Sequence, residues 1–108
     1  MRAQKRMSLA VIPVLLAAVA CRTKTKAEAV QTAEKYMAAG EYGKAIIEYK
    51  NALKVEPRSA ELQYKLGQAY EMLGNLPLAK KCYEQVTGYE GNPLAPDAHE
   101  ALARLQQG

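Results

Sequence analysis

The chain contains few residues whose side chains could carry out catalysis. Its only histidine is His99, and its two cysteines are Cys21 and Cys82. Cys82 and His99 fall on separate predicted helices, and a thiol nucleophile needs a base that a third group orients. The sequence has no glycine-rich phosphate loop, no Cys-x-x-Cys pair and no His-Glu-x-x-His motif. We therefore expect a noncatalytic protein without a metal or cofactor, and a thiol-dependent enzyme built on Cys82 is the alternative.

Cys21 stands in a different chemical setting, directly after an apolar segment. Three basic residues among the first six precede an uncharged run from Ser8 to Ala20. As a helix, this run would span roughly 20 Å, which is shorter than the ~30 Å core of a bilayer. The pattern is therefore typical of a signal peptide rather than of a transmembrane anchor.

The segment AAVAC, Ala17 to Cys21, resembles a bacterial lipobox. In that motif the cysteine becomes the first residue of the mature protein, and its thiol carries a diacylglycerol. The resemblance implies a signal peptide over residues 1–20 and lipidation of Cys21, whose acyl chains would anchor the protein to a membrane without crossing it. Arg22 stands where Asp would resemble an inner-membrane retention signal, so an outer-membrane location facing the periplasm is favoured in a diderm bacterium. Ordinary cleavage after Ala20 and an uncleaved anchor are the alternatives.

The net charge of +4 comes mostly from this leader. The leader holds three of the 15 basic residues and none of the 11 acidic ones, so the rest of the chain is nearly neutral. Arg22, Lys24 and Lys26 form a small basic cluster around a predicted linker, residues 21–25. No basic stripe remains for a phosphate backbone, so we expect no nucleic-acid partner.

Two blocks of 34 residues, 26–59 and 60–93, follow the linker. In each block, apolar residues recur every three or four positions along two segments, which predicts two amphipathic helices per block. Gly40 can take the left-handed conformation that ends the first of these helices. The pairs that recur at a spacing of 34 are Tyr36 and Tyr70, Gly40 and Gly74, Ala45 and Ala79, and Tyr49 and Tyr83.

The two blocks resemble tetratricopeptide repeats, whose period is 34 residues. The resemblance implies an all-α fold, an α-α superhelix or solenoid built from two helix-turn-helix repeats. Residues that match preferred family positions are Tyr36, Ala45, Tyr49, Ala52 and Pro57 in the first block, and Gly67, Tyr70, Ala79 and Tyr83 in the second. The chain departs from the family pattern at Ala29 and Gln63, where a bulky residue is usual, and at Gly91, which replaces a proline.

One more helix is predicted after Pro93, within residues 94–108. Asp97 falls in its first turn, and a stripe of four apolar residues follows. The segment is too short for a third repeat, so we expect a capping helix with a polar outer face. The stripe is Ala98, Ala101, Leu102 and Leu105, and the residues expected on the outer face are His99, Glu100, Arg104 and Gln106.

In the tetratricopeptide family, the first helix of each repeat lines a concave groove that holds a protein ligand. Mapped onto this chain, the resemblance predicts a mildly acidic groove composed of Ala27, Val30, Glu34, Met37, Ala38, Glu61, Tyr64, Gln68, Glu71 and Met72. Chaperone-binding members clamp a terminal carboxylate with Lys, Arg and Asn at several of these positions. This chain has Val30, Glu34, Tyr64 and Gln68 instead, so a peptide or helix with apolar anchors and a basic residue fits better.

These predictions together describe a protein-interaction adaptor, a membrane-tethered lipoprotein of a bacterial envelope assembly or export complex. The segment KAIIEYKNALKVEP is most similar to repeats in lipoproteins of exopolysaccharide or protein-sorting export systems. Two other interpretations stay open. In the first, the protein is a structural subunit that forms homo-oligomers by stacking solenoid ends through the face from Ala98 to Leu105. In the second, it is a fragment of a longer repeat array.

Overall fold

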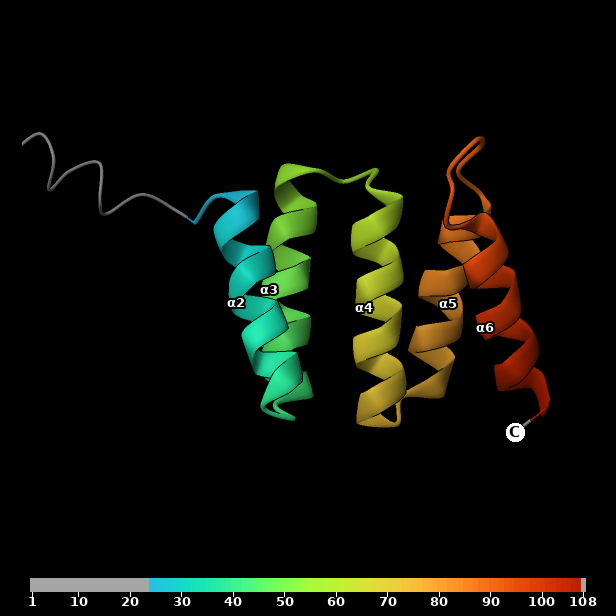
Figure 1. The fold of residues 1–108 in the computed structure, drawn as a ribbon, viewed down its shortest axis with the longest axis horizontal. Helices are drawn as coiled ribbons and strands as arrows, with labels where there is room; N and C mark the ends of the chain where they lie inside the picture. The colour runs from blue at the N-terminus through green and yellow to red at the C-terminus, as the bar shows by residue number, and fades with distance from the viewer. Residues whose placement is uncertain (1–23, 108) are drawn as a thin grey trace, which may run out of the picture.

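The structure is a computed structural model that describes residues 24–107, and this part of the chain folds into a row of five α-helices. Consecutive helices run in opposite directions, and the short turns that join them alternate between the lower and upper ends of the helices (Figure 1). The helices are α2 (Lys26–Ala38), α3 (Tyr42–Val55), α4 (Ala60–Leu73), α5 (Leu76–Thr87) and α6 (Ala95–Gln107). The predicted all-α fold, with two helical hairpins and a final helix, is confirmed.

Some predictions concern residues outside this range. The signal peptide over residues 1–20 and the lipidation of Cys21 lie outside the described residues, as does the linker up to residue 23. Between residues 24 and 107, no helix has the length and apolar character needed to cross a bilayer.

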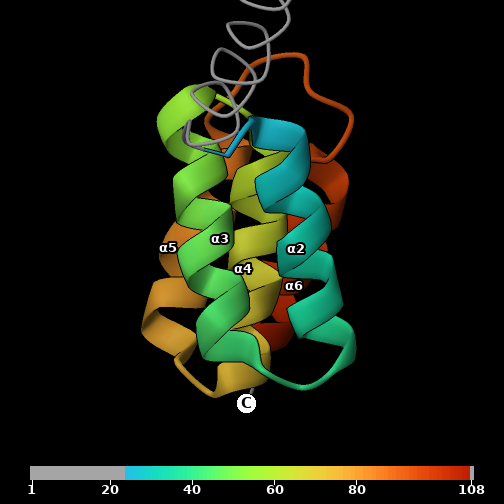
Figure 2. The same ribbon diagram turned by 90° about the vertical axis from the view of Figure 1, so that its left-hand side faces the viewer.

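Each helix packs mainly against its neighbours along the chain, α2 with α3, α3 with α4, α4 with α5, and α5 with α6. Viewed along the row, α2 and α6 lie on one side, α3 and α5 lie on the other, and α4 lies between them (Figure 2). This nearest-neighbour packing is typical of a helical repeat protein, in which each unit is stabilised by the next.

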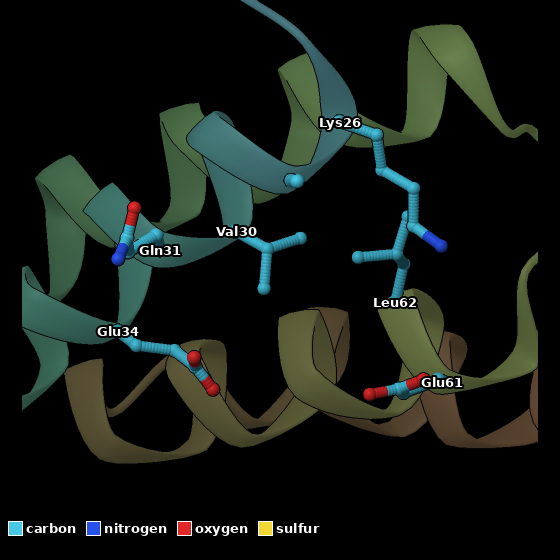
Figure 3. A pocket seen from close by; sticks show the side chains of 7 residues that line it. Lys26, Val30, Gln31, Glu34, Glu61 and Leu62 are labelled. Atoms are coloured by element: carbon cyan, nitrogen blue, oxygen red, sulfur yellow. The ribbon is translucent and has the colours of Figure 1, made fainter.

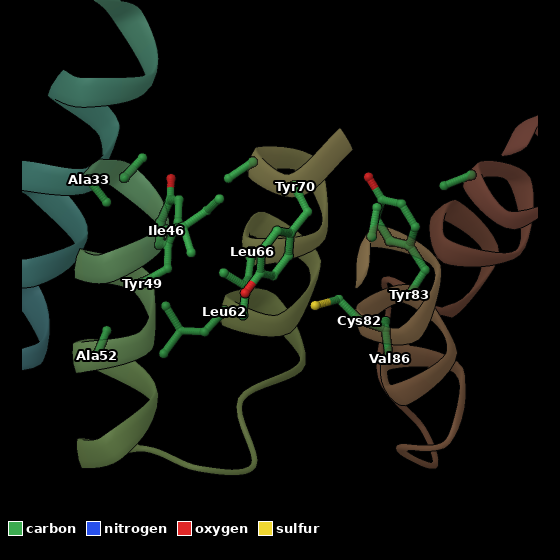
Figure 4. Packing of buried hydrophobic residues seen from close by; sticks show 14 of the residues in the cluster. Ala33, Ile46, Tyr49, Ala52, Leu62, Leu66, Tyr70, Cys82, Tyr83 and Val86 are labelled. Atoms are coloured by element: carbon green, nitrogen blue, oxygen red, sulfur yellow. The ribbon is translucent and has the colours of Figure 1, made fainter. Parts of the chain in front are cut away.

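The core is one continuous cluster to which all five helices contribute. Small residues one period apart, Ala33, Gly67 and Ala101, are buried where the helices approach each other. Larger side chains such as Leu62, Tyr70 and Tyr83 fill the space between the helices (Figure 4). Burial of these apolar groups supplies most of the folding free energy.

Tyr36 and Tyr70 stand one period apart but are not equally buried. Tyr70 belongs to the buried core, whereas Tyr36 is only partly buried. The difference follows from position, because α3 precedes α4 in the row and covers Tyr70, while no helix within residues 24–107 precedes α2.

Side-chain hydrogen bonds and a glycine turn define the two ends of α2. The Thr25 hydroxyl accepts a hydrogen bond from the Glu28 backbone N–H (3.2 Å), and the Thr25 N–H donates to the Glu28 carboxylate (3.3 Å). This reciprocal capping box satisfies amide donors that would otherwise have no partner. Gly40 follows α2 with a φ of +77°, which confirms the predicted left-handed turn.

By its spacing from α2 and α4, α6 corresponds to the first helix of a repeat. Ala98 and Ala101 are buried in the core, and Leu102 and Leu105 pack against it, so the predicted apolar stripe is confirmed. Asp97 lies in the first turn, as expected. Leu102 and Leu105 are only partly buried, and the stacking of copies through the face from Ala98 to Leu105 stays a prediction.

The four polar residues predicted for the outer face of α6, His99, Glu100, Arg104 and Gln106, are all exposed. Arg104 also reaches across to the Glu71 carboxylate of α4, with Nη2 2.8 Å from Oε1. Arg104 therefore links α6 to α4 while its side chain stays accessible to solvent.

Candidate protein-binding surface

Three shallow hollows lie along the first helices of the repeats. The first, of ≈ 500 Å³, lies between α2 and α4, where Val30 points into the space flanked by Glu34 and Glu61 (Figure 3). Lys26, Gln31 and Leu62 also line this hollow. Because Leu62 is almost fully buried, it forms a fixed apolar floor.

The second and third hollows continue this surface toward α6. Ala60, Glu61, Tyr64, Lys65, Gln68, Pro93 and Leu94 line the second, and Met37, Tyr42, Gln68, Glu71, Met72 and Arg104 line the third. The first two hollows share Glu61, and the second and third share Gln68. We call the three together the groove, since they form one continuous surface over α2, α4 and α6.

The structure places nearly all of the predicted groove residues on this surface. Val30 and Glu34 lie in the first hollow, Tyr64 in the second, Gln68 in the second and third, and Met37, Glu71 and Met72 in the third. Ala27 and Glu61 line it too, whereas Ala38 is exposed at the end of α2 and lines none of the three. That the groove holds a partner remains a prediction.

Glu34 does not present a free negative charge. Its carboxylate accepts a hydrogen bond from the Lys65 ammonium at 2.7 Å, which links α2 to α4. This hydrogen bond raises the pKa of Lys65 above its ordinary value. The cation also lies 3.8 Å from Glu61, so Lys65 partly neutralises two groove carboxylates.

Glu71 is engaged even more fully. Arg104 donates to both of its oxygens, at 2.8 Å and 2.9 Å, and the Tyr83 hydroxyl donates to Oε1 at 2.8 Å. Burial, reinforced by this hydrogen bond, raises the pKa of Tyr83 far above its usual range. Glu71 therefore ties α4, α5 and α6 together, so Glu34 and Glu71 contribute less to the predicted acidic character of the groove than Glu61, which is 67% exposed.

The side chains left to face a partner are apolar or adaptable. Tyr64 is partly buried, with its ring centroid 5.5 Å from that of the buried Tyr83. Met72 is 57% exposed, and a methionine can adapt its flexible side chain to an irregular surface. Together with Val30 and Met37, they form patches that a protein side chain could cover.

Sequence reasoning missed the contribution of α6 to this surface. Leu94, directly before α6, lines the second hollow, and Arg104 of α6 lines the third. The signal was present in the sequence, because Ala101 stands one period after Gly67, just as Gly67 stands one period after Ala33. That spacing assigns α6 to the groove side together with α2 and α4.

The structure offers no support for catalysis by Cys82. The thiol is buried, and burial raises its pKa to about 11, so it is protonated near neutral pH. The charged groups that act on it are Lys50 and Lys81, whereas His99 is exposed on α6. Among residues 24–107, no three His, Cys, Asp or Glu side chains are grouped so that they could hold a metal ion.

Comparison with protein families agrees with this geometry. A family model described as TPR repeat matches residues 33–74, and a model described as tetratricopeptide repeat matches residues 60–93. No curated protein matches the chain. The two matches run from α2 to the turn before α6 and overlap in α4. With its antiparallel hairpins and 34-residue spacing, the chain belongs to the tetratricopeptide repeat family.

Proposed function

We propose that this protein is a noncatalytic adaptor that holds a protein or peptide partner in its groove while its N-terminus is tethered to a bacterial membrane. Tetratricopeptide repeats generally bind proteins, and two family matches cover α3, α4 and α5. The observation that carries the proposal is the groove itself. Its carboxylates Glu34 and Glu71 are occupied by ion pairs, whereas Met37, Tyr64 and Met72 remain accessible as contact residues.

The tether rests on the sequence AAVAC before residue 22, and an envelope assembly or export complex is the setting that it favours. Two lysines at the start of the described residues, Lys24 before α2 and Lys26 at its first position, form ion pairs with α3 and the residue that ends it. Lys24 Nζ lies 3.1 Å from Glu48, and Lys26 Nζ lies 2.9 Å from Glu56, so both lysines contact the α3 side of the first repeat. Tethering confines partner and groove to one surface and raises their effective concentration, so a weak groove is sufficient.

Site-specific photocrosslinking of the full chain in a bacterial host tests partner binding. A photoreactive residue at Met37 or Tyr64 should give a discrete crosslinked partner. The same residue at Ile47, which is 60% exposed on α3, is the matched control and should not. Crosslinks that are equal at all three positions, or that form only at Ile47, would contradict a groove function.

The intact mass of the membrane-extracted protein tests the tether. We expect a mature chain that begins at Cys21 and carries added acyl mass, and we expect a Cys21→Ala variant to lose that mass. An unmodified chain cut after Ala20 would remove the membrane half of the proposal and leave a secreted adaptor.

A second candidate function is a self-associating structural subunit. Ile47 and Val55, both on α3, are 60% and 61% exposed, and large apolar side chains on a surface favour association. Sedimentation of the full chain in detergent, beside an Ile47→Ser variant, tests this candidate. A monomer in both samples would exclude it.

A further inference from the structure

We propose that the second hollow, between α4 and the Pro93–Leu94 segment that leads into α6, takes an apolar side chain flanked by a basic residue, so that the partner segment carries net positive charge. This inference rests on the proposed function, because it concerns one part of the same groove. It goes further in assigning the apolar side chain to one hollow and the basic residue to the carboxylates beside it.

The apolar part of the hollow has fixed walls. Tyr64 and Leu94 both pack against the buried core, and the Tyr64 ring lies against that of Tyr83, which is fully buried. The hollow has a volume of ≈ 550 Å³, ample for one large aliphatic or aromatic side chain. Because these walls are already ordered, a side chain that enters loses little binding energy to reorganisation of the protein.

The cations near this hollow are already engaged. Lys65 donates to Glu34 at 2.7 Å, and Arg104 is held by both oxygens of Glu71. Neither cation is free to meet an acidic partner without breaking a contact between helices.

Carboxylates near the hollow, in contrast, remain available. Asp97 and Glu100 are exposed on α6, and neither forms an ion pair within residues 24–107. Asp97 lies in the first turn of α6, three residues after Leu94, which lines the hollow, and Glu100 lies one turn further along the same face of the helix. Burial raises the pKa of Tyr64, Asp97 raises it further, and Arg104 opposes this effect. Glu61 adds a third carboxylate on the opposite wall, 67% exposed and only loosely paired with Lys65.

This distribution of charge selects one occupant. A lysine or arginine beside the inserted apolar side chain would meet Asp97 and Glu100, which gives complementary charges. An acidic peptide or a nucleic acid would meet like charges instead. A second copy of the chain, docked groove to groove, would bring the same carboxylates together.

Random peptides displayed on phage and selected on the full chain in detergent micelles provide the probe. We expect enriched peptides to pair a leucine-like or aromatic residue with a neighbouring lysine or arginine. The affinity of such a peptide should fall about tenfold in an Asp97→Asn/Glu100→Gln variant, because two exposed charge contacts are removed. It should not change in a Glu84→Gln/Glu90→Gln variant, which alters exposed carboxylates away from the hollow.

Several outcomes would overturn the inference. Enrichment of acidic or uncharged peptides would do so, as would an affinity that the Asp97→Asn/Glu100→Gln variant leaves unchanged. A Leu94→Ser variant, checked for native helix content by circular dichroism, should also weaken binding, and full affinity there would exclude the hollow. Peptides whose binding depends on Val30 and Met37 but not on Asp97 would reject this inference and leave the adaptor function standing. Failure to enrich any peptide would also reject it, and the photocrosslinks at Met37 and Tyr64 would then decide the proposed function separately.

Discussion

Replacing Gly67 with alanine should destabilise the protein, although alanine is the better helix former. A Cβ at Gly67 would lie 2.8 Å from Cε1 and 3.0 Å from Cδ1 of Tyr83. The Tyr83 ring cannot easily retreat, because it is fully buried, its centroid lies 5.5 Å from that of Tyr64, and its hydroxyl donates to Glu71. The added methyl group would therefore force α4 and α5 apart or displace this ring.

The expected magnitude combines two opposing effects. Overpacking a well-packed core costs typically about 1–3 kcal/mol, while replacing glycine with alanine inside a helix contributes about 1 kcal/mol of stability. The net loss at Gly67 is therefore about 1 kcal/mol. Gly43 in α3 is the matched control, because its added Cβ meets no atom within 4 Å. Gly43→Ala should stabilise by up to about 1 kcal/mol, which separates the two variants by about 2 kcal/mol.

Urea unfolding followed by circular dichroism measures both variants. A Gly67→Ala protein as stable as Gly43→Ala would refute the reasoning, since it would mean that the helices separate at no cost. Adding Tyr83→Leu should suppress the effect of Gly67→Ala, because the ring that the methyl group meets is then absent. A Gly67→Ala loss that persists in the Tyr83→Leu background would assign the cost to another neighbour.

Three further predictions concern single residues. Tyr83→Phe should lower the free energy of unfolding by about 1–2 kcal/mol, because the buried ring stays while its hydrogen bond to Glu71 is lost; unchanged urea unfolding would contradict this. Burial raises the pKa of Cys82 from 9.0 to about 11, so its contribution to stability is present below pH 9 and is lost as the pH rises to 11. Between pH 9 and pH 11, the free energy of unfolding should fall less in Cys82→Ala than in the unchanged protein, and an equal fall in both would reject the raised pKa of Cys82. Thr25→Ala should lower the free energy of unfolding by about 1 kcal/mol, because it removes the cap of α2, whereas Thr25→Ser should leave it unchanged. Equal free energies of unfolding for the two variants would show that the capping box does not stabilise the protein.

The fold could be predicted because its determinants are local. Apolar residues at helical spacing define the helices, and the glycine at position 40 ends α2 with a positive φ. Pro77 lies in the first turn of α5, where its missing N–H is harmless. The different burial of Tyr36 and Tyr70 could not be predicted from the residues themselves, because burial depends on which helices lie beside them.

The charges of the groove could not be predicted in the same way. The positions of Glu34 and Glu71 on the groove side follow from helical phase, but their ion pairs join different helices. Glu34 and Lys65 are separated by 31 residues, and Glu71 and Arg104 by 33. A single sequence does not indicate which of many lysines and arginines reaches a given carboxylate, since side-chain direction and helix spacing decide it.

The two separations nonetheless share a cause that explains the role of α6. Both are close to one period, because residues one period apart lie at the same height on adjacent first helices, α2 beside α4 and α4 beside α6. A carboxylate on one such helix therefore meets a cation one helix further along, Glu34 with Lys65 and then Glu71 with Arg104. α6 ends this series within the described residues, so no later helix supplies cations for its own carboxylates, Asp97 and Glu100. The carboxylates left exposed near the second hollow are therefore Asp97 and Glu100 of the last helix, together with Glu61 of α4, which is only loosely paired with Lys65.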